Sequence, residues 1–208
     1  MCCLFLAASS TVAIAQTNVV DLVNPIIGTN GMGHTFPGAC VPFGLVQLSP
    51  DTDTIPHNVD GKYQPRSYEY CAGYQHKDSS IVGFSHTHFS GTGHSDLGDI
   101  LIMPTTGTLK LNPGTATNPD GGYRSRFSHD TEISRPGYYE VMLADYGVKA
   151  QLTTTQRAGI HKYTYPTNSE NQRIILDMIH GIYNYDGKVL WTNIRVENDT
   201  LVTGYRIT

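Results

Sequence analysis

The chain has 208 residues, of which 15% are charged, and a formal net charge of −4 at pH 7. It contains no run of basic residues, so we expect no nucleic acid and no anionic membrane among its partners, because both require clustered Lys and Arg. With 21 Gly and 13 Tyr, the composition is rich in turn-forming and aromatic residues, which favours an all-β globular domain over helices or disorder.

An uncharged, apolar segment opens the chain. It runs from Cys3 to Ala15 and ends in a small-x-small pattern, which predicts a secretory signal peptide at residues 1–15. The segment is shorter than the roughly 20 apolar residues that span a bilayer, so we expect no membrane span. The sequence therefore predicts a secreted or periplasmic protein whose mature domain covers residues 16–208. Of the remaining cysteines, Cys40 and Cys71 could form a disulfide or stay as two buried thiols.

The first half of the mature chain is dense in Gly, Pro, Ser, Thr and His. Residues 28–33 and 54–61 are expected to be loops, because Gly provides left-handed turns and Pro fixes φ. Between and after these loops we predict strands at residues 41–48, 80–89 and 100–103.

Beyond residue 105 the pattern changes to a series of short strands separated by turns. In residues 148–155 apolar and polar side chains alternate, with Val148, Ala150 and Leu152 on one face. This spacing predicts an all-β fold, an antiparallel β-sandwich, with Trp191 in its core. The further strands are expected at residues 138–143, 161–165, 173–178, 190–196 and 201–206. The last strand pattern continues to Thr208, so we expect a domain truncated at its C-terminal end.

The densest group of functional side chains lies in residues 83–99, GFSHTHFSGTGHSDLGD. If the chain is extended up to residue 88, His86 and His88 project from the same face. The glycine-rich turn that follows would then bring His94, Asp96 and Asp99 back toward them.

Three interpretations of this group remain open. It could be a zinc site built on His86 and His88. It could be a sugar subsite, in which imidazoles and carboxylates bind hydroxyl groups while Phe89 stacks on a sugar ring. It could also be a structural corner, with its histidines tied to backbone carbonyls. A Ser-His-Asp triad using Ser85 or Ser90 is disfavoured, because the segment has no nucleophile-elbow pattern.

Two further segments carry candidate binding residues. The glycine-rich loop at residues 31–38 presents His34 and Phe36, which suit either the rim of a sugar site or a plain turn. The aromatic stretch at residues 63–74 includes Arg66 and Tyr70, which fit a hydroxyl-rich ligand or an interdomain surface.

Four blocks in this order resemble the N-terminal domain of glycoside hydrolase family 92. They are VNPIIGT at residues 23–29, GHTFPG at 33–38, PFGLVQLSPD at 42–51, and GFSHTHFSGTG at 83–93 followed by DLGD at 96–99. The resemblance implies an N-terminal β-sandwich that packs on a C-terminal (α/α)6 barrel, which is missing from these residues. It also implies a calcium-dependent, inverting exo-α-mannosidase that acts on mannose-containing glycans.

The resemblance implies a division of roles between the two domains. The acid–base pair and most of the Ca²⁺ ligands belong to the barrel, so we assign no catalytic residue and no metal ligand to this chain. By carry-over, the substrate-binding residues would be His34, Phe36, Arg66, Tyr70, His86 and His88. The alternatives are a stand-alone carbohydrate-binding or interaction module without catalysis, and a zinc hydrolase that depends on His86.

Overall fold

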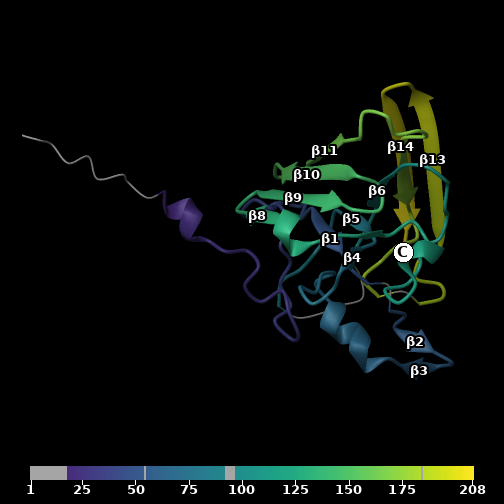
Figure 1. Cartoon of the computed structure of the whole chain (residues 1–208). Coiled ribbons are helices and arrows are strands. Elements are labelled where there is room, and N and C mark those ends of the chain that lie inside the picture. The colour runs from purple at the N-terminus through teal and green to yellow at the C-terminus, as the bar shows by residue number, and fades with distance from the viewer. Residues whose placement is uncertain (1–17, 54, 92–96, 184) are drawn as a thin grey trace, which may run out of the picture.

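The computed structural model describes residues 18–53, 55–91, 97–183 and 185–208 (Figure 1). The predicted signal peptide, His94 and Asp96 therefore lie outside the described residues. Two four-stranded antiparallel sheets form the body of the chain. The first has the order β1 (Ser49–Asp51), β5 (Gly83–Ser85), β6 (Leu101–Thr105), β12 (Arg173–Asp177), and the second the order β11 (Gly159–Thr164), β10 (Val148–Thr154), β9 (Tyr138–Leu143), β8 (Ile133–Arg135).

Three two-stranded ladders and four 3₁₀ helices complete the regular structure of the described residues. The ladders pair β2 (Asn58–Val59) with β3 (Lys62–Tyr63), β4 (Ser80–Ile81) with β7 (Ser125–Arg126), and β13 (Trp191–Asn198) with β14 (Leu201–Ile207). The 3₁₀ helices are η1 (Val19–Leu22), η2 (Pro65–Tyr70), η3 (Pro119–Gly121) and η4 (His129–Thr131). None of these described helices is long and apolar enough to cross a membrane.

The core lies between the two large sheets, which confirms the predicted antiparallel sandwich. Side chains of β5 and β6, such as Phe84 and Met103, belong to the same buried cluster as side chains of β9 and β10. Along β10, Val148, Ala150 and Leu152 are buried while the residues between them are only half-buried. The alternation predicted for this strand is therefore confirmed, and it determines which face of the second sheet meets the first.

Two predicted strands differ from the observed ones. The strand predicted at residues 41–48 is a turn, because Phe43 lies in the left-handed region at φ 58° and Gly44 N donates to Val41 O. Of these described residues only Leu48 takes part in a β-bridge, to Ala39, and β1 begins one residue later. The strand predicted at residues 80–89 is divided into β4 and β5, and it ends at Ser85.

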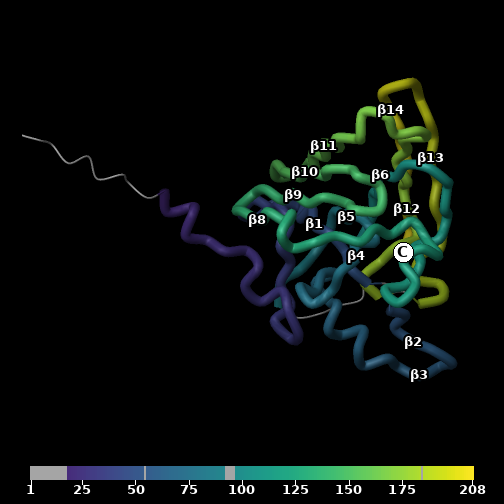
Figure 2. Tube along the Cα trace, viewed as in Figure 1, coloured from purple at the N-terminus to yellow at the C-terminus, as the bar shows by residue number. Residues whose placement is uncertain are grey.

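In the view of Figure 2 the β13–β14 hairpin projects beside β12 and β6, and Arg206 of β14 donates to the carbonyl oxygen of His180, which follows β12. Its apolar side chains are exposed, and the prediction that Trp191 belongs to the core is wrong, since its side chain is 60% exposed. Aromatic character within a regular strand pattern predicted burial, but each strand of this hairpin pairs only with the other.

Cys40 and Cys71 are free thiols. Cys40 is exposed, whereas Cys71 is buried, and this burial raises the pKa of its thiol to about 11.

Truncation of a core side chain should destabilise the sandwich far more than truncation of an exposed one. We expect Leu152→Ala to lower the free energy of unfolding by about 2–5 kcal/mol, because it removes buried methyl groups and leaves a cavity. Ile160→Ala on the adjacent strand β11 is the control, since Ile160 is 52% exposed. Equal losses in chemical denaturation would contradict the assignment of the core face.

Candidate functional site

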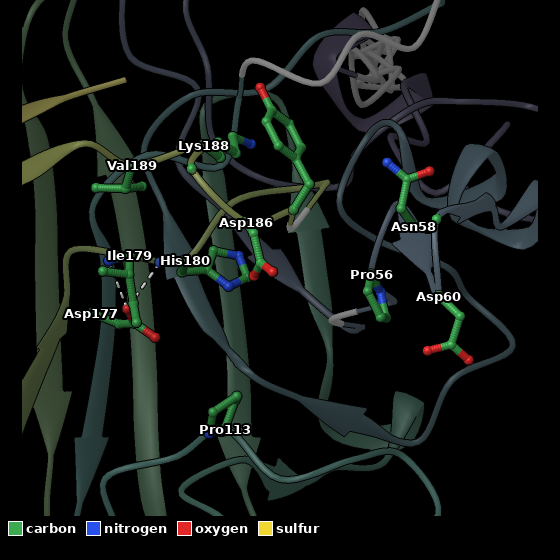
Figure 3. Close-up of a pocket in the computed structure, with 13 residues that line it drawn as sticks. Pro56, Asn58, Asp60, Pro113, Asp177, Ile179, His180, Asp186, Lys188 and Val189 are labelled. Atoms are coloured by element: carbon green, nitrogen blue, oxygen red, sulfur yellow. Dashed lines mark hydrogen bonds between the residues drawn. The ribbon is translucent and has the colours of Figure 1, made fainter.

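A cavity of about 850 Å³ opens between the β2–β3 hairpin and the segment that follows β12 (Figure 3). In Figure 3, Pro56, Asn58 and Asp60 lie across the cavity from Asp177 and Ile179. The remaining lining residues are Gly61, Pro113, His180, Tyr185, Asp186, Gly187, Lys188 and Val189. The wall thus presents carboxylates, an imidazole and an amide to the same space.

Asp177, at the end of β12, shapes the turn that brings His180 to this cavity. Its Oδ1 accepts hydrogen bonds from the backbone N–H groups of Ile179 and His180, both at 2.9 Å (Figure 3). The Tyr123 hydroxyl donates to its other oxygen, Oδ2. The carboxylate therefore satisfies two backbone donors as the strand ends, as an Asx turn does.

Behind the cavity wall, the carboxylate of Asp51 joins two imidazoles. His180 Nε2 lies 2.8 Å from Asp51 Oδ2, and His88 Nε2 lies 2.8 Å from Asp51 Oδ1. All three residues are almost completely buried. Burial alone would raise the pKa of Asp51, but the charge of His88 and the hydrogen bonds from both rings outweigh it, so the pKa lies well below its usual range.

The geometry around His88 assigns hydrogens to both of its ring nitrogens. Its Nδ1 is 2.8 Å from the carbonyl oxygen of Gln47, which can only accept, and its Nε2 faces the ionised Asp51. His88 is therefore an imidazolium in this arrangement. Ser85 Oγ also lies 3.2 Å from Nε2, so the serine and the carboxylate share one nitrogen. A catalytic triad needs them on different nitrogens, and the structure excludes that alternative here.

Gly73 makes room for this buried charge pair. It adopts φ +82°, and a Cβ at this position would lie 2.1 Å from Asp51 Oδ1 and 3.0 Å from the His88 ring. Only glycine fits, because any side chain would displace the carboxylate.

His86 belongs to a separate network that connects the two sheets. Its Nδ1 lies 2.7 Å from Ile100 O and its Nε2 lies 3.1 Å from His161 Nε2, while His161 Nδ1 lies 2.7 Å from the Tyr163 hydroxyl. Since Ile100 O only accepts, His86 carries its hydrogen on Nδ1 and accepts at Nε2. All three hydrogen bonds then point the same way: the Tyr163 hydroxyl donates to His161, His161 donates to His86, and His86 donates to Ile100 O.

This directed chain of hydrogen bonds requires two neutral imidazoles. Burial lowers the pKa of both rings, that of His161 to about 3, and a charge on His88 lowers the pKa of His86 further, as a charge on His86 does for His161. His86 and His88 therefore do not share a face as predicted from the sequence. Since β5 ends at Ser85, the two side chains enter different networks.

The glycine-rich loop before β1 packs against these elements through both of its predicted site residues. The His34 ring meets Tyr68 edge-on at 4.8 Å, and the Phe36 ring lies 5.3 Å from the ring of His88. His34 is 8% exposed, adopts φ 53°, and its buried Nε2 has no hydrogen-bond partner among the described residues. A non-glycine residue in the left-handed region with an unpartnered imidazole nitrogen is costly, which is typical of a functional position.

Arg66 and Tyr70 lie on η2. The Arg66 residue is exposed, whereas Tyr70 is buried and donates from its hydroxyl to Asp78 Oδ1 at 3.1 Å. Burial raises the pKa of Tyr70 well above its usual range, so the hydroxyl stays protonated as a donor.

None of the six predicted binding residues is among the described residues that line the cavity. His88 is connected to its wall through Asp51 and His180. Sequence reasoning did not single out Asp51, Asp177 or His180. A usable signal was present: each of the three comes at or just after the end of a strand, where a loop begins.

The described residues contain a group that could hold a metal ion, at His76, His129 and Glu132, and it does not include His86 or His88. Two imidazole nitrogens and one carboxylate do not fit Ca²⁺, which takes six to eight oxygen ligands. We therefore derive no catalytic step through calcium from these residues.

Residues 22–208 match the N-terminal domain of glycosyl hydrolase family 92. The chain belongs to this family. The recognition made from the four sequence blocks is thereby confirmed, and so is the fold.

Solved family 92 structures superpose well on the chain. An α-mannosidase from Bacteroides thetaiotaomicron, determined in complex with mannoimidazole, is 47% identical over 90% of this chain with a TM-score of 0.81, and the match covers 23% of that protein. A family 92 inverting mannosidase from the same bacterium is 25% identical over 79% of this chain, with a TM-score of 0.59 and 20% of that protein covered.

A curated relative from Arthroderma benhamiae is named an uncharacterized secreted glycosidase. It is 29% identical over 170 residues, which is 77% of this chain and 19% of the relative. The family 92 chain described here thus spans about a fifth to a quarter of the length of these relatives.

Replacement of the bridging carboxylate should destabilise the domain in a pH-dependent way. At neutral pH we expect Asp51→Asn to lower the free energy of unfolding by about 3–5 kcal/mol, because one imidazolium loses its buried partner. The depressed pKa means that the carboxylate stabilises the fold above its unfolded pKa of about 3.9 and loses this effect as the pH falls further. Chemical denaturation should show the difference from wild type shrinking below about pH 4, whereas the exposed Asp130→Asn should match wild type throughout.

The neutral His86–His161 pair should destabilise the folded state on acidification. Because the unfolded rings titrate near 6.5 and the folded His161 ring near 3, the unfolded chain binds more protons below neutrality. Stability should therefore decrease from about pH 7 toward pH 4, and less so in His161→Phe. Long-range ¹H–¹⁵N NMR should show the Nδ1–H tautomer for His86 and the Nε2–H tautomer for His161; an imidazolium signal at neutral pH would refute the directed chain.

Proposed function

We propose that the chain forms one wall of the substrate pocket of an exported, calcium-dependent, inverting exo-α-mannosidase, which removes terminal α-mannose from glycans. The observation that carries the proposal is the 47% identity, over 90% of the chain, with a family 92 α-mannosidase solved with mannoimidazole. Export is supported by the apolar N-terminal segment and by the curated relative named as a secreted glycosidase.

The cavity supports the assignment of a pocket wall. Sugar hydroxyls both donate and accept hydrogen bonds, and the lining offers acceptors at Asp60, Asp177 and Asp186 together with the amide of Asn58. His180 is held in place within the lining, since a buried carboxylate fixes its Nε2. A preorganised polar group of this kind orients a ligand at little entropic cost.

The acid and the base are proposed to lie in the rest of the protein. An inverting glycosidase needs two carboxyl groups about 6.5–9.5 Å apart, with room for a water molecule between them. The relatives are four to five times longer than their matched region. In the family arrangement that region packs against an (α/α)6 barrel, and we propose that the barrel supplies the acid–base pair and the Ca²⁺ ligands.

The exposed apolar surface of the β13–β14 hairpin suits contact with that barrel. Trp191 is 60% exposed and Val196 is 71% exposed, with Ile194, Leu201, Val202 and Tyr205 also exposed on the same hairpin. Apolar patches of this kind on a folded domain are typical of interfaces.

The six substrate-binding residues predicted from the sequence divide into two groups under this proposal. Arg66 is exposed, and Phe36 and His86 are half-buried, so these side chains are the candidates for sugar contact. His34, Tyr70 and His88 are buried and would act through the neighbours that they position: Tyr68, Asp78 and Asp51.

Turnover of an aryl α-mannoside tests the function. The full-length protein should release mannose with inversion, and the 208-residue chain alone should release none, because it lacks the acid–base pair. We expect His180→Ala in the full-length protein to lower kcat/KM by at least about tenfold, since it removes an oriented group from the wall.

His180→Gln is the matched control, because its amide N–H can still donate to Asp51 and preserve the fold. A thermal unfolding curve for each variant separates loss of fold from loss of binding. Mannose release by the isolated chain would overturn the location proposed for the acid and base. Mannan binding by the full-length protein without hydrolysis would instead favour the carbohydrate-binding module.

A further inference from the structure

A second cluster of potential ligands lies outside the cavity and shares no residue with its lining. His76 comes just before β4, His129 opens η4, and Glu132 follows η4. Each offers one ligand atom, and the three atoms lie within 4.8 Å of one another. His76 thus meets His129 and Glu132, although it lies 53 or more positions before them in the sequence.

The carboxylate of Glu132 is buried and held in place by hydroxyl groups. Its side chain is 3% exposed. The Tyr74 hydroxyl donates to both oxygens, at 2.9 and 3.0 Å, and the Tyr139 hydroxyl donates to Oε1 at 2.6 Å. His129 Nδ1 lies 2.7 Å from Oε2. Support of a ligand by outer hydrogen bonds of this kind is characteristic of metal sites in proteins.

His76 contributes an imidazole nitrogen that the fold leaves unsatisfied. Its ring stacks on the His129 ring with the centroids 3.9 Å apart and the planes tilted by 33°. The Nδ1 atom of His76 is buried and has no hydrogen-bond partner among the described residues. Buried polar atoms nearly always have a partner, so an unpaired nitrogen beside a second imidazole and a carboxylate indicates a missing ligand.

His129 leaves one side of the cluster open. Its side chain is 37% exposed, and the short η4 turn that carries it is capped by Ser128, whose Oγ accepts from Asp130 N. The ring also packs edge-on against Phe127, at 5.0 Å between centroids, and its exposed side lets solvent reach the cluster.

We propose that His76, His129 and Glu132 bind a zinc ion, with a water molecule in the fourth position. Two imidazoles and one carboxylate are a set that Zn²⁺ accepts in tetrahedral geometry, whereas Ca²⁺ requires oxygen ligands. Zinc–ligand bonds of 2.0–2.2 Å place tetrahedral ligands about 3.3 Å apart. The exposed His129 ring reaches this spacing by turning away from the His76 ring.

A bound ion would fasten η4 and β8 to the segment that precedes β4. The present connection is the hydrogen bond of Tyr74 to Glu132 together with the stacked rings of His76 and His129. Ions that bind only the folded state stabilise it by mass action, so zinc should raise the unfolding temperature of the domain. This site is independent of the mannosidase proposal, because among the described residues none of its members makes a hydrogen bond or a ring contact with the cavity lining.

Zinc binding to the full-length protein, purified without a polyhistidine tag, tests the proposal. Isothermal titration with Zn²⁺ is carried out with excess Ca²⁺ present, so that oxygen-rich sites stay filled. Wild type should bind one ion that His129→Ala and Glu132→Gln bind at least about tenfold more weakly. Tyr74→Phe should weaken this binding less, since it removes a positioning hydroxyl and no ligand. Co²⁺ in place of Zn²⁺ should give the visible absorption of a tetrahedral complex in wild type and not in His129→Ala.

His57→Ala is the control, because it removes a histidine outside the cluster and should leave zinc binding unchanged. Thermal unfolding adds a second readout: Zn²⁺ should raise Tm of wild type and of His57→Ala, but not of His129→Ala. Because His129 also pairs with the buried Glu132 carboxylate, each variant is compared with its own metal-free Tm, and the readout is the shift that Zn²⁺ produces. Zinc affinity that is the same in wild type and His129→Ala, or no binding by wild type, would overturn the proposal.

Discussion

The buried carboxylate of Asp51 is the interaction on which the arrangement of the cavity depends. It lies at the end of β1 and accepts from His88, which follows β5, and from His180, which follows β12. A buried ion is tolerated only when it is paired and hydrogen-bonded. The loops at the ends of three strands of one sheet are therefore held in register by a single side chain.

The surrounding residues serve this requirement. Gly73 leaves space beside the carboxylate. The carbonyl oxygen of Gln47 accepts a hydrogen bond from Nδ1 of His88, and Phe36 packs against the His88 ring. The second sheet contributes differently, through the chain of neutral rings from Tyr163 to His86. The first sheet is thus organised around a buried charge pair. Its junction with the second sheet instead depends on the rings of His86 and His161 remaining neutral.

Much of the fold could be predicted from the sequence because alternation reports burial directly. β9, β10 and β12 lie within a residue of their predicted bounds, and in β9 and β10 every second side chain is buried in the core. The region before residue 100 was harder to predict. Its conformation depends on positive φ at His34 and Phe43 and on hydrogen bonds between distant segments, and no local pattern encodes either.

The candidate site was predicted only in part, for the same reason. The sequence pointed to His86 and His88 as a pair, whereas their partners, His161 and Asp51, are 75 and 37 residues away. A dipeptide spacing predicts which side chains are near each other only if the strand continues, and here it ends at Ser85. His180 carried no motif, and its role follows from Asp51 alone.

The separation between Asp51 and His180 has a consequence for how the protein is made. The two residues are 129 positions apart, so the wall of the cavity cannot close until His180 has left the ribosome. Until then Asp51 has no second imidazole to bind, and the loops at that end of the sheet lack a common anchor. Contacts between residues so far apart in sequence form late in folding, because the entropy cost of closing the intervening loop comes before the contact can stabilise the fold. The cavity wall therefore forms only after β12 has joined the first sheet.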